Sequence, residues 1–195
     1  KISDWESHAN TLASEKSVKE GPKREQDELY KQQNLASEGY KALYTIADNP
    51  SERTEPMLRL KQTFGTMRDR VIDARKKGKE NDPEIVVLRR TLSQVLAQAI
   101  EMGQQQTRDK NYATAIIFYD LVVDLARFPG FAHFEKARTY SLMGRKKDVL
   151  PELKKAVETG MDPKDMGAVA EFAEFRANPE FQKILQMTPP ELPKR

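Results

Sequence analysis

The sequence predicts an all-α protein, in which a long antiparallel helical hairpin precedes shorter helix–turn–helix units and a capping helix pair. Two observations lead to this fold class. Apolar residues recur at alternating spacings of three and four over three long segments, and this period places them on one face of a helix. No segment alternates apolar and polar residues as a half-buried strand does, because the valine pairs at 86–87 and 122–123 lie inside longer helical periods.

The composition limits the class of protein. The chain has 195 residues, of which 32% are charged, and its mean hydropathy is −0.74. We therefore expect a soluble protein with one domain or two small ones. No apolar run reaches the roughly 18 residues of a membrane span. The net charge of +3 is too small to indicate nucleic-acid binding by itself.

The chain contains no cysteine, which excludes disulfides, thiolate nucleophiles and cysteine metal sites. Its first residue is Lys1 rather than Met, so we expect a chain that was processed or excised from a longer one, with any signal peptide removed. A cytoplasmic location and a bacterial periplasmic one both fit this composition, and the sequence leaves the compartment open.

The first 83 residues divide into an arm and a hairpin. Residues 1–21 are expected to form an N-terminal arm or short helix, which a Gly-Pro pair ends. Residues 22–83 are expected to form the long helical hairpin, with a break at Asn49-Pro50. The predicted inward positions are Leu29, Gln33, Ala36, Tyr40, Leu43 and Ala47 in its first helix, and Met57, Leu60, Phe64, Met67, Val71 and Ala74 in its second.

Residues 84–187 are expected to form a second helical domain, which a Pro-rich tail at 188–195 follows. Several of its helices start at an Asp-Pro or Asn-Pro pair, because such a side chain caps a helix and proline fits the first helical position. These pairs are Asp82-Pro83, Asp162-Pro163 and Asn178-Pro179. The first helix, over 84–108, has inward positions at Ile85, Leu88, Leu92, Val95, Ala99 and Met102. Shorter helices are predicted near 111–127, 131–143, 146–159, 163–175 and 179–187.

A period of 34 residues connects the segments over 96–129 and 130–163. The aligned pairs are Gly103 with Ala137, Gln106 with Tyr140, Tyr112 with Lys146, Ala115 with Val149, Tyr119 with Leu153 and Val122 with Ala156. Small residues recur where two helices would cross closely, and large residues recur beside them. This period is the spacing of tetratricopeptide repeats (TPRs), in which each repeat is one helix–turn–helix unit.

The two segments resemble TPRs at particular residues. The small residue of the family's first helix falls on Gly103 and Ala137. The alanine of the second helix falls on Ala115, its aromatic residue on Tyr119, and the next small position on Ala156. These matches predict that the small residues are buried at helix crossings.

The resemblance covers about residues 96–187 and has departures. Ala99 and His133 stand where the family has tryptophan or leucine, and Lys136 stands where leucine is usual. The resemblance implies two TPR-like repeats, closed by a C-terminal capping helix pair over about 163–187.

The resemblance also implies a partner-binding groove, because the first helices of such repeats line a concave surface. Carried onto this chain, the groove positions are Ala97, Ile100, Gln104, Thr107, Arg108, Phe131, Phe134, Arg138, Ser141 and Leu142. Apolar anchors beside an exposed arginine would suit a peptide or helix that carries apolar residues and a carboxylate. Packing of Phe131 and Phe134 in the core is the alternative.

The sequence offers no residue constellation for catalysis. It has none of the short motifs of phosphate loops, dinucleotide sites, zinc proteases or serine hydrolases. Its two histidines, His8 and His133, lack ligand spacing, and Asp120 and Asp124 are expected on a solvated helix face. We therefore expect no enzyme, no cofactor, no metal and no small-molecule substrate.

The expected function is non-catalytic protein–protein interaction, as an adaptor, scaffold or assembly subunit, with the partner and the oligomeric state left open. The first alternative is an accessory helical domain or subunit of a larger enzyme or of a membrane-associated complex. A weaker alternative is binding of nucleic acid or another anionic surface through residues 68–80. Residues 51–80 hold nine Lys or Arg and five Asp or Glu, a net charge of +4. Against this alternative, the stretch lacks aromatic residues for base stacking, and its lysines suit a helix C-terminus.

Overall fold

The computed structural model describes residues 27, 30, 31, 34–164 and 166–191, and the expected N-terminal arm over 1–21 lies outside them. In this part of the chain every regular element is a helix and no strand occurs, which confirms the all-α class. The first helix is described without a gap over 34–48. It is followed by η1 (Pro50–Glu52), α2 (Thr54–Lys76), α3 (Pro83–Arg108), α4 (Tyr112–Leu125), α5 (Gly130–Leu142), α6 (Lys146–Glu158), η2 (Met166–Ala168), η3 (Ala170–Phe175) and α7 (Pro179–Leu185).

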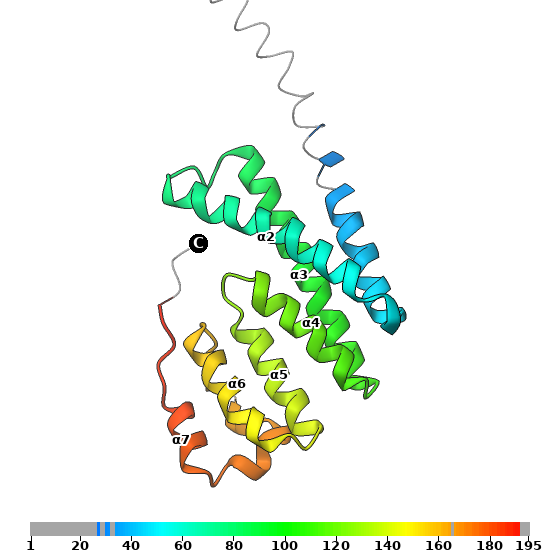
Figure 1. The fold of residues 1–195 in the computed structure, drawn as a ribbon. Helices are drawn as coiled ribbons and strands as arrows, with labels where there is room; N and C mark the ends of the chain where they lie inside the picture. The colour runs from blue at the N-terminus through cyan, green and yellow to red at the C-terminus, as the bar shows by residue number, and fades with distance from the viewer. Residues whose placement is uncertain (1–26, 28–29, 32–33, 165, 192–195) are drawn as a thin grey trace, which may run out of the picture.

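The helices follow one another in space largely as they do along the chain (Figure 1). α2 packs on α3 and α4, α3 packs on α4, α4 on α5, and α5 on α6. Because the turns between them are short, consecutive helices run in opposite directions. η3 packs on α5 and α7 packs on α6, so these two segments close the C-terminal end of the array.

The helix over 34–48 packs against α2 and α3. Its Leu43 and Ile46 are fully buried, in the same core as Phe64 of α2 and Val95 of α3. Gly39 allows the close approach, since a Cβ atom at this position would lie only 2.7 Å from Val95 Cγ2. The sequence pattern did not include Ile46 among the inward positions.

Most of the inward positions predicted for the long helices lie in this core. The buried ones are Ala36, Leu43, Leu60, Phe64, Met67, Ala74, Ile85, Leu88, Val95, Ala99 and Met102. The partly buried ones are Tyr40, Ala47, Met57, Val71 and Leu92. Leu29 and Gln33 lie outside the described residues. The alternating period of three and four is thus a correct guide to which face of each helix is covered.

Two apolar cores lie along the array. The first joins the 34–48 helix, α2, α3 and α4, and ends at Ala132 near the start of α5. The second joins α5, α6, η2, η3 and α7, around Leu153, Phe172 and Phe181. The predicted boundary at 83–84 lies at the start of α3, and α3 and α4 share the first core with α2. The change from one core to the other falls within α5.

The small residues predicted at helix crossings are all buried. Ala115, Ala137 and Ala156 are 0% exposed, and Gly103 is among the buried residues of α3. A Cβ atom at Gly103 would lie 2.6 Å from Cε1 of Tyr119, whose ring is also fully buried. Any larger residue at this position would therefore force α3 and α4 apart.

The segment predicted as a short α-helix over 163–175 is instead two 3-10 turns, η2 and η3. Val169 lies between them in an extended conformation, which interrupts any longer helix. Phe172 and Phe175 are three residues apart, so they share one face of a helix with three residues per turn. Both rings are buried in the second core.

The predicted helix starts differ in how they are capped. Asn178 accepts hydrogen bonds from two backbone N–H groups of α7, as predicted. Asp82 occupies the N-cap position of α3, but its side chain makes no capping hydrogen bond. Asp162 Oδ1 accepts a hydrogen bond from the backbone N of Lys164 at 3.0 Å, and a turn follows rather than an α-helix. Residues 188–191, the described part of the Pro-rich tail, are not helical.

Candidate protein-binding face

The predicted groove residues lie on α3 and α5, which contact each other directly. We call this surface, together with the part of η3 that contacts α5, the α3–α5 face. Its members are Ile100, Gln104 and Arg108 of α3, Phe131, Glu135, Arg138, Ser141 and Leu142 of α5, and Glu171 of η3. The two glutamates were not among the predicted site residues.

A chain of polar side chains crosses the middle of this face. Gln104 Nε2 donates to Glu135 Oε1 at 3.0 Å, and Arg138 Nη1 lies 3.1 Å from Glu135 Oε2. Arg138 also binds Glu171, with 2.6 Å between Nη2 and Oε1. Ser141 Oγ donates to the backbone carbonyl of Glu171. These bonds fasten α3, α5 and η3 to one another.

The guanidinium of Arg138 is therefore already paired with two carboxylates. Burial lowers the pKa of Arg138, but Glu171 and Glu135 raise it by more, so the net shift is upward. Burial raises the pKa of Glu171, but the hydrogen bond from Arg138 lowers it below its usual value. Arg138 was expected to be an exposed cation. A partner's carboxylate would instead have to displace an internal one, so Arg138 is a poor anchor for it.

The two phenylalanines of α5 have different environments. Phe134 is 8% exposed and packs edge-on against Phe172 of η3, with ring centroids 5.8 Å apart. Phe131 is 46% exposed and stacks on Phe134, with centroids 6.2 Å apart. Of the two alternatives that the sequence left open, core packing holds for Phe134 and surface exposure holds for Phe131.

The exposed anchors of the face lie toward its edges. Ile100 is only partly exposed, because it packs against the first core. Arg108 is exposed, and its Nη2 and Nε donate to Gln105 Oε1 at 2.7 and 3.2 Å. Leu142, at the C-terminal end of α5, is 45% exposed. The accessible side chains are therefore Arg108, Leu142 and Phe131.

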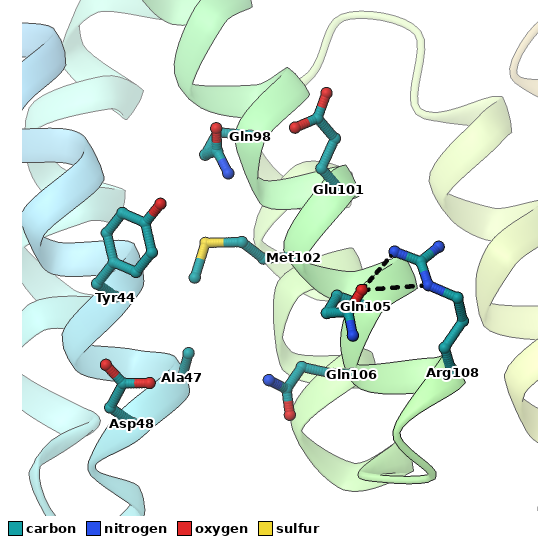
Figure 2. A pocket seen from close by; sticks show the side chains of 9 residues that line it. All are labelled: Tyr44, Ala47, Asp48, Gln98, Glu101, Met102, Gln105, Gln106 and Arg108. Atoms are coloured by element: carbon teal, nitrogen blue, oxygen red, sulfur yellow. Dashed lines mark hydrogen bonds between the residues drawn. The ribbon is translucent and has the colours of Figure 1, made fainter.

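A recess lies beside Arg108, between the 34–48 helix and the C-terminal half of α3 (Figure 2). Its volume is about 380 Å³. The lining residues are Tyr44, Ala47, Asp48, Gln98, Glu101, Met102, Gln105, Gln106 and Arg108. Tyr44 is 54% exposed, whereas Met102 is nearly buried at 9%. No sequence pattern indicated this recess, because its two walls come from helices that are far apart along the chain.

A buried network of charged side chains lies between α4, α5 and α6. His133 Nδ1 lies 2.6 Å from Glu152 Oε2, and Lys136 Nζ lies 2.8 Å from Asp120 Oδ1 and 3.5 Å from Glu152 Oε2. Burial raises the pKa of Glu152, but hydrogen bonds from His133 and Lys155 and the charge of Lys136 lower it to about 2. The sequence contained one sign of this network, since His133 and Lys136 stand where the TPR family has apolar residues.

Asp120 and Asp124 form ion pairs with lysines of the neighbouring helices. Asp120 pairs with Lys136 of α5, and Asp124 Oδ2 lies 2.5 Å from Nζ of Lys61 on α2. Both carboxylates are 49% exposed, so solvent screens these pairs and each contributes little to stability. Their role is to connect α4 to its neighbours on both sides.

The basic stretch at the end of α2 is partly used within the fold. Arg68 donates to the backbone carbonyl of Asp124 and to Oδ1 of Asp69. Arg70 Nη2 lies 2.5 Å from Oε1 of Glu84 on α3. These contacts leave fewer cations of the 68–80 stretch available for an anionic surface.

No three histidine, aspartate or glutamate side chains in the described part of the chain are placed to hold a metal ion. No helix among these residues is long and apolar enough to cross a membrane. Comparison with protein-family models, with curated proteins and with solved structures finds no match for this chain.

Proposed function

We propose that the protein is a non-catalytic protein-binding module that acts as an adaptor, a scaffold or an assembly subunit. In this proposal, α3 to α6 form two TPR-like units and the partner lies on the α3–α5 face. The exposed Arg108, Phe131 and Leu142 support this assignment, because an arginine and apolar rings or chains around a polar centre are typical anchors of protein interfaces.

The turn inside each unit is the observation that carries the proposal. Lys110 has a φ of 63° and Gly144 has a φ of 71°, and these two left-handed residues are 34 positions apart. In both turns the N–H of the next residue donates to the carbonyl five positions earlier, at 2.8 Å and 2.9 Å. This pattern is a Schellman motif at the end of the first helix of each unit. The same motif also ends α2 at Gly78 and α6 at Gly160, so the support for two repeated units comes from the spacing of 34 residues between Lys110 and Gly144 and not from the motif itself.

The proposal is tested by affinity capture from the source cell with quantitative mass spectrometry. The test variant combines Phe131→Ser and Leu142→Ser on the α3–α5 face. The matched control is Leu58→Ser, because Leu58 is 56% exposed on α2 and lies outside the face. A protein that wild type and control retain should fall about ten-fold or more in the double variant, as loss of two interface anchors predicts. Equal retention by all three proteins would refute binding through this face.

The same experiment addresses the alternatives. Capture of enzyme or membrane-complex subunits through the α3–α5 face would identify the chain as their accessory subunit. Binding of an anionic surface through residues 68–80 is less favoured, because Arg68 and Arg70 are bonded within the fold. Turnover by the purified chain that a point substitution abolishes would contradict the non-catalytic assignment.

A further inference from the structure

The recess beside Arg108 lies where two helices end side by side. In Figure 2 the residue numbers increase downward along both helices, from Tyr44 to Asp48 and along α3, so the helices run in the same direction. The C-terminal end of a helix carries about half a negative charge, and two such ends meet here. Arg53 offsets part of this potential, because its Nε donates to the backbone carbonyl of Ile46 at 2.6 Å.

Two carboxylates add to the negative potential of the recess. Asp48 is the last residue of its helix, where a negative side chain opposes the helix dipole, and Glu101 lies on α3. Neither carboxylate has a hydrogen bond or an ion pair with a residue that the structure describes. Arg108 is the cation of the lining, and Gln105 holds its guanidinium on the side away from Tyr44 (Figure 2). The lining therefore has a net charge of −1.

The apolar part of the lining suits a long aliphatic chain. The ring of Tyr44 is more than half exposed, and Ala47 and the nearly buried Met102 lie beside it. Lysine and arginine pack their methylene stems on apolar surface while the charged end stays near carboxylates and water. An exposed tyrosine ring also attracts a cation placed over its face. A recess of about 380 Å³ is large enough for one such side chain and part of its backbone.

We infer that this recess receives a lysine or arginine side chain of the partner protein. The inference rests on the proposed protein-binding function and names the partner's chemistry at one point of the contact. The carboxylates of Asp48 and Glu101, which lie at opposite ends of the recess (Figure 2), both attract the cation, and its stem lies on Tyr44 and Met102. This assignment differs from the sequence-based expectation of a carboxylate ligand, because Arg138 is paired internally, whereas Asp48 and Glu101 have no partner among the residues that the structure describes.

The test is an NMR titration of the ¹⁵N-labelled protein with two capped peptides. One is acetyl-Ala-Leu-Arg-Leu-Ala-amide, and the other has citrulline in place of arginine, which keeps the shape but removes the charge. The arginine peptide should shift the amide signals of residues 44–48 and 98–108 in a saturable way. The citrulline peptide should bind about ten-fold more weakly, because it lacks the charge-assisted bonds. Equal binding of the two peptides, or shifts elsewhere only, would overturn the inference.

Variants locate the binding site. Asp48→Asn and Glu101→Gln should each weaken binding of the arginine peptide about five-fold, as loss of one exposed ion pair predicts. The control is Glu38→Gln, which removes the same charge from an exposed position of the same helix that does not line the recess. Equal effects of Glu38→Gln and Asp48→Asn would show general charge attraction and refute the site. Each variant should keep the wild-type melting temperature, since the substituted side chains are exposed.

The result of the peptide titration can be distinguished from the result of the affinity capture that tests the proposed function. If affinity capture shows a partner that depends on Phe131 and Leu142, but the arginine peptide does not bind, the recess inference fails and the proposed function stands. If the arginine peptide binds at Asp48 and Glu101 while no captured protein depends on the α3–α5 face, the proposed face fails and the recess remains a cation-binding site.

Discussion

Phe134→Ala should destabilise the protein much more than Phe131→Ala does. Phe134 is a core residue, whereas Phe131 lies on the surface of the same helix. Phe134 is 8% exposed, and its ring packs against Phe172, which is 0% exposed. Removing a buried phenylalanine ring costs about 3–5 kcal/mol, because the lost transfer free energy adds to the cost of the cavity. For a protein of this length each kcal/mol lowers the melting temperature by about 2–4 °C, so the expected drop is about 6–20 °C.

Phe131→Ala is the matched control for this prediction. Phe131 is in the same helix and stacks on Phe134, but its side chain is 46% exposed. Its removal should cost about 1 kcal/mol, mostly the stacking contact, and should lower the melting temperature by about 2–4 °C. Thermal unfolding of both variants, followed by circular dichroism at the helix band, measures the difference. Equal drops for the two variants would show that η3 does not cover Phe134 in solution.

Three further predictions concern stability. Ala115→Leu should overpack the crossing of α3 and α4, because Ala115 is 0% exposed, and a loss of about 1–3 kcal/mol should appear in urea unfolding. Glu152→Gln should cost about 3 kcal/mol at pH 7, since a pKa of about 2 against the ordinary 4.5 stabilises the ionised form by about 1.36 kcal/mol per unit. The wild type should lose this stability as the pH falls from about 4.5 toward 2, whereas the variant should show a loss smaller by about this amount in unfolding curves over this range, because Glu171 still titrates with a lowered pKa. Arg138→Glu should lower the melting temperature strongly, by the equivalent of about 2–4 kcal/mol, because it places a third carboxylate between Glu135 and Glu171. An unchanged melting temperature for this variant would show that the polar chain across the face does not form.

The helices and their covered faces could be predicted from the sequence, because helix period is a local property. Residues such as Leu60 and Val95 recur at the spacing of one helix face, and they are buried whatever lies opposite them. Small residues that recur at a fixed period likewise indicate, from the sequence alone, where two helices cross closely. Gly103 is required by the ring of Tyr119, which lies on the next helix, so its spacing to Ala137 indicated a crossing before the structure showed one.

Burial of charged residues could not be predicted in the same way, because it depends on what the neighbouring helices present. His133 and Lys136 are buried since Glu152 of α6 and Asp120 of α4 provide their partners. A single helix pattern contains no information about these partners. The same reason explains Arg138, which looked like an exposed cation until η3 brought Glu171 against it.

The 3-10 form of the segment after α6 could not be predicted from the sequence. The Asp162-Pro163 pair starts a turn, and the sequence alone does not show how far a helix continues from it. The extended residue Val169 divides the segment into two 3-10 helices, and Phe172 and Phe175 of the second are buried in the second core.

The way the array ends determines which part of the α3–α5 face a partner can use. At the C-terminal end, η3 covers α5 through Phe172 and Glu171, so a further helix cannot pack there without displacing two buried or ion-paired side chains. At the other end, the 34–48 helix lies against α3 but leaves the recess with Tyr44 and Asp48 open. A partner therefore has access to α3 along the recess and to α5 only at Phe131 and near its C-terminal end. In the proposed repeat array, binding energy should consequently come from the α3 side, with a basic residue in the recess and apolar contacts at the two ends of α5.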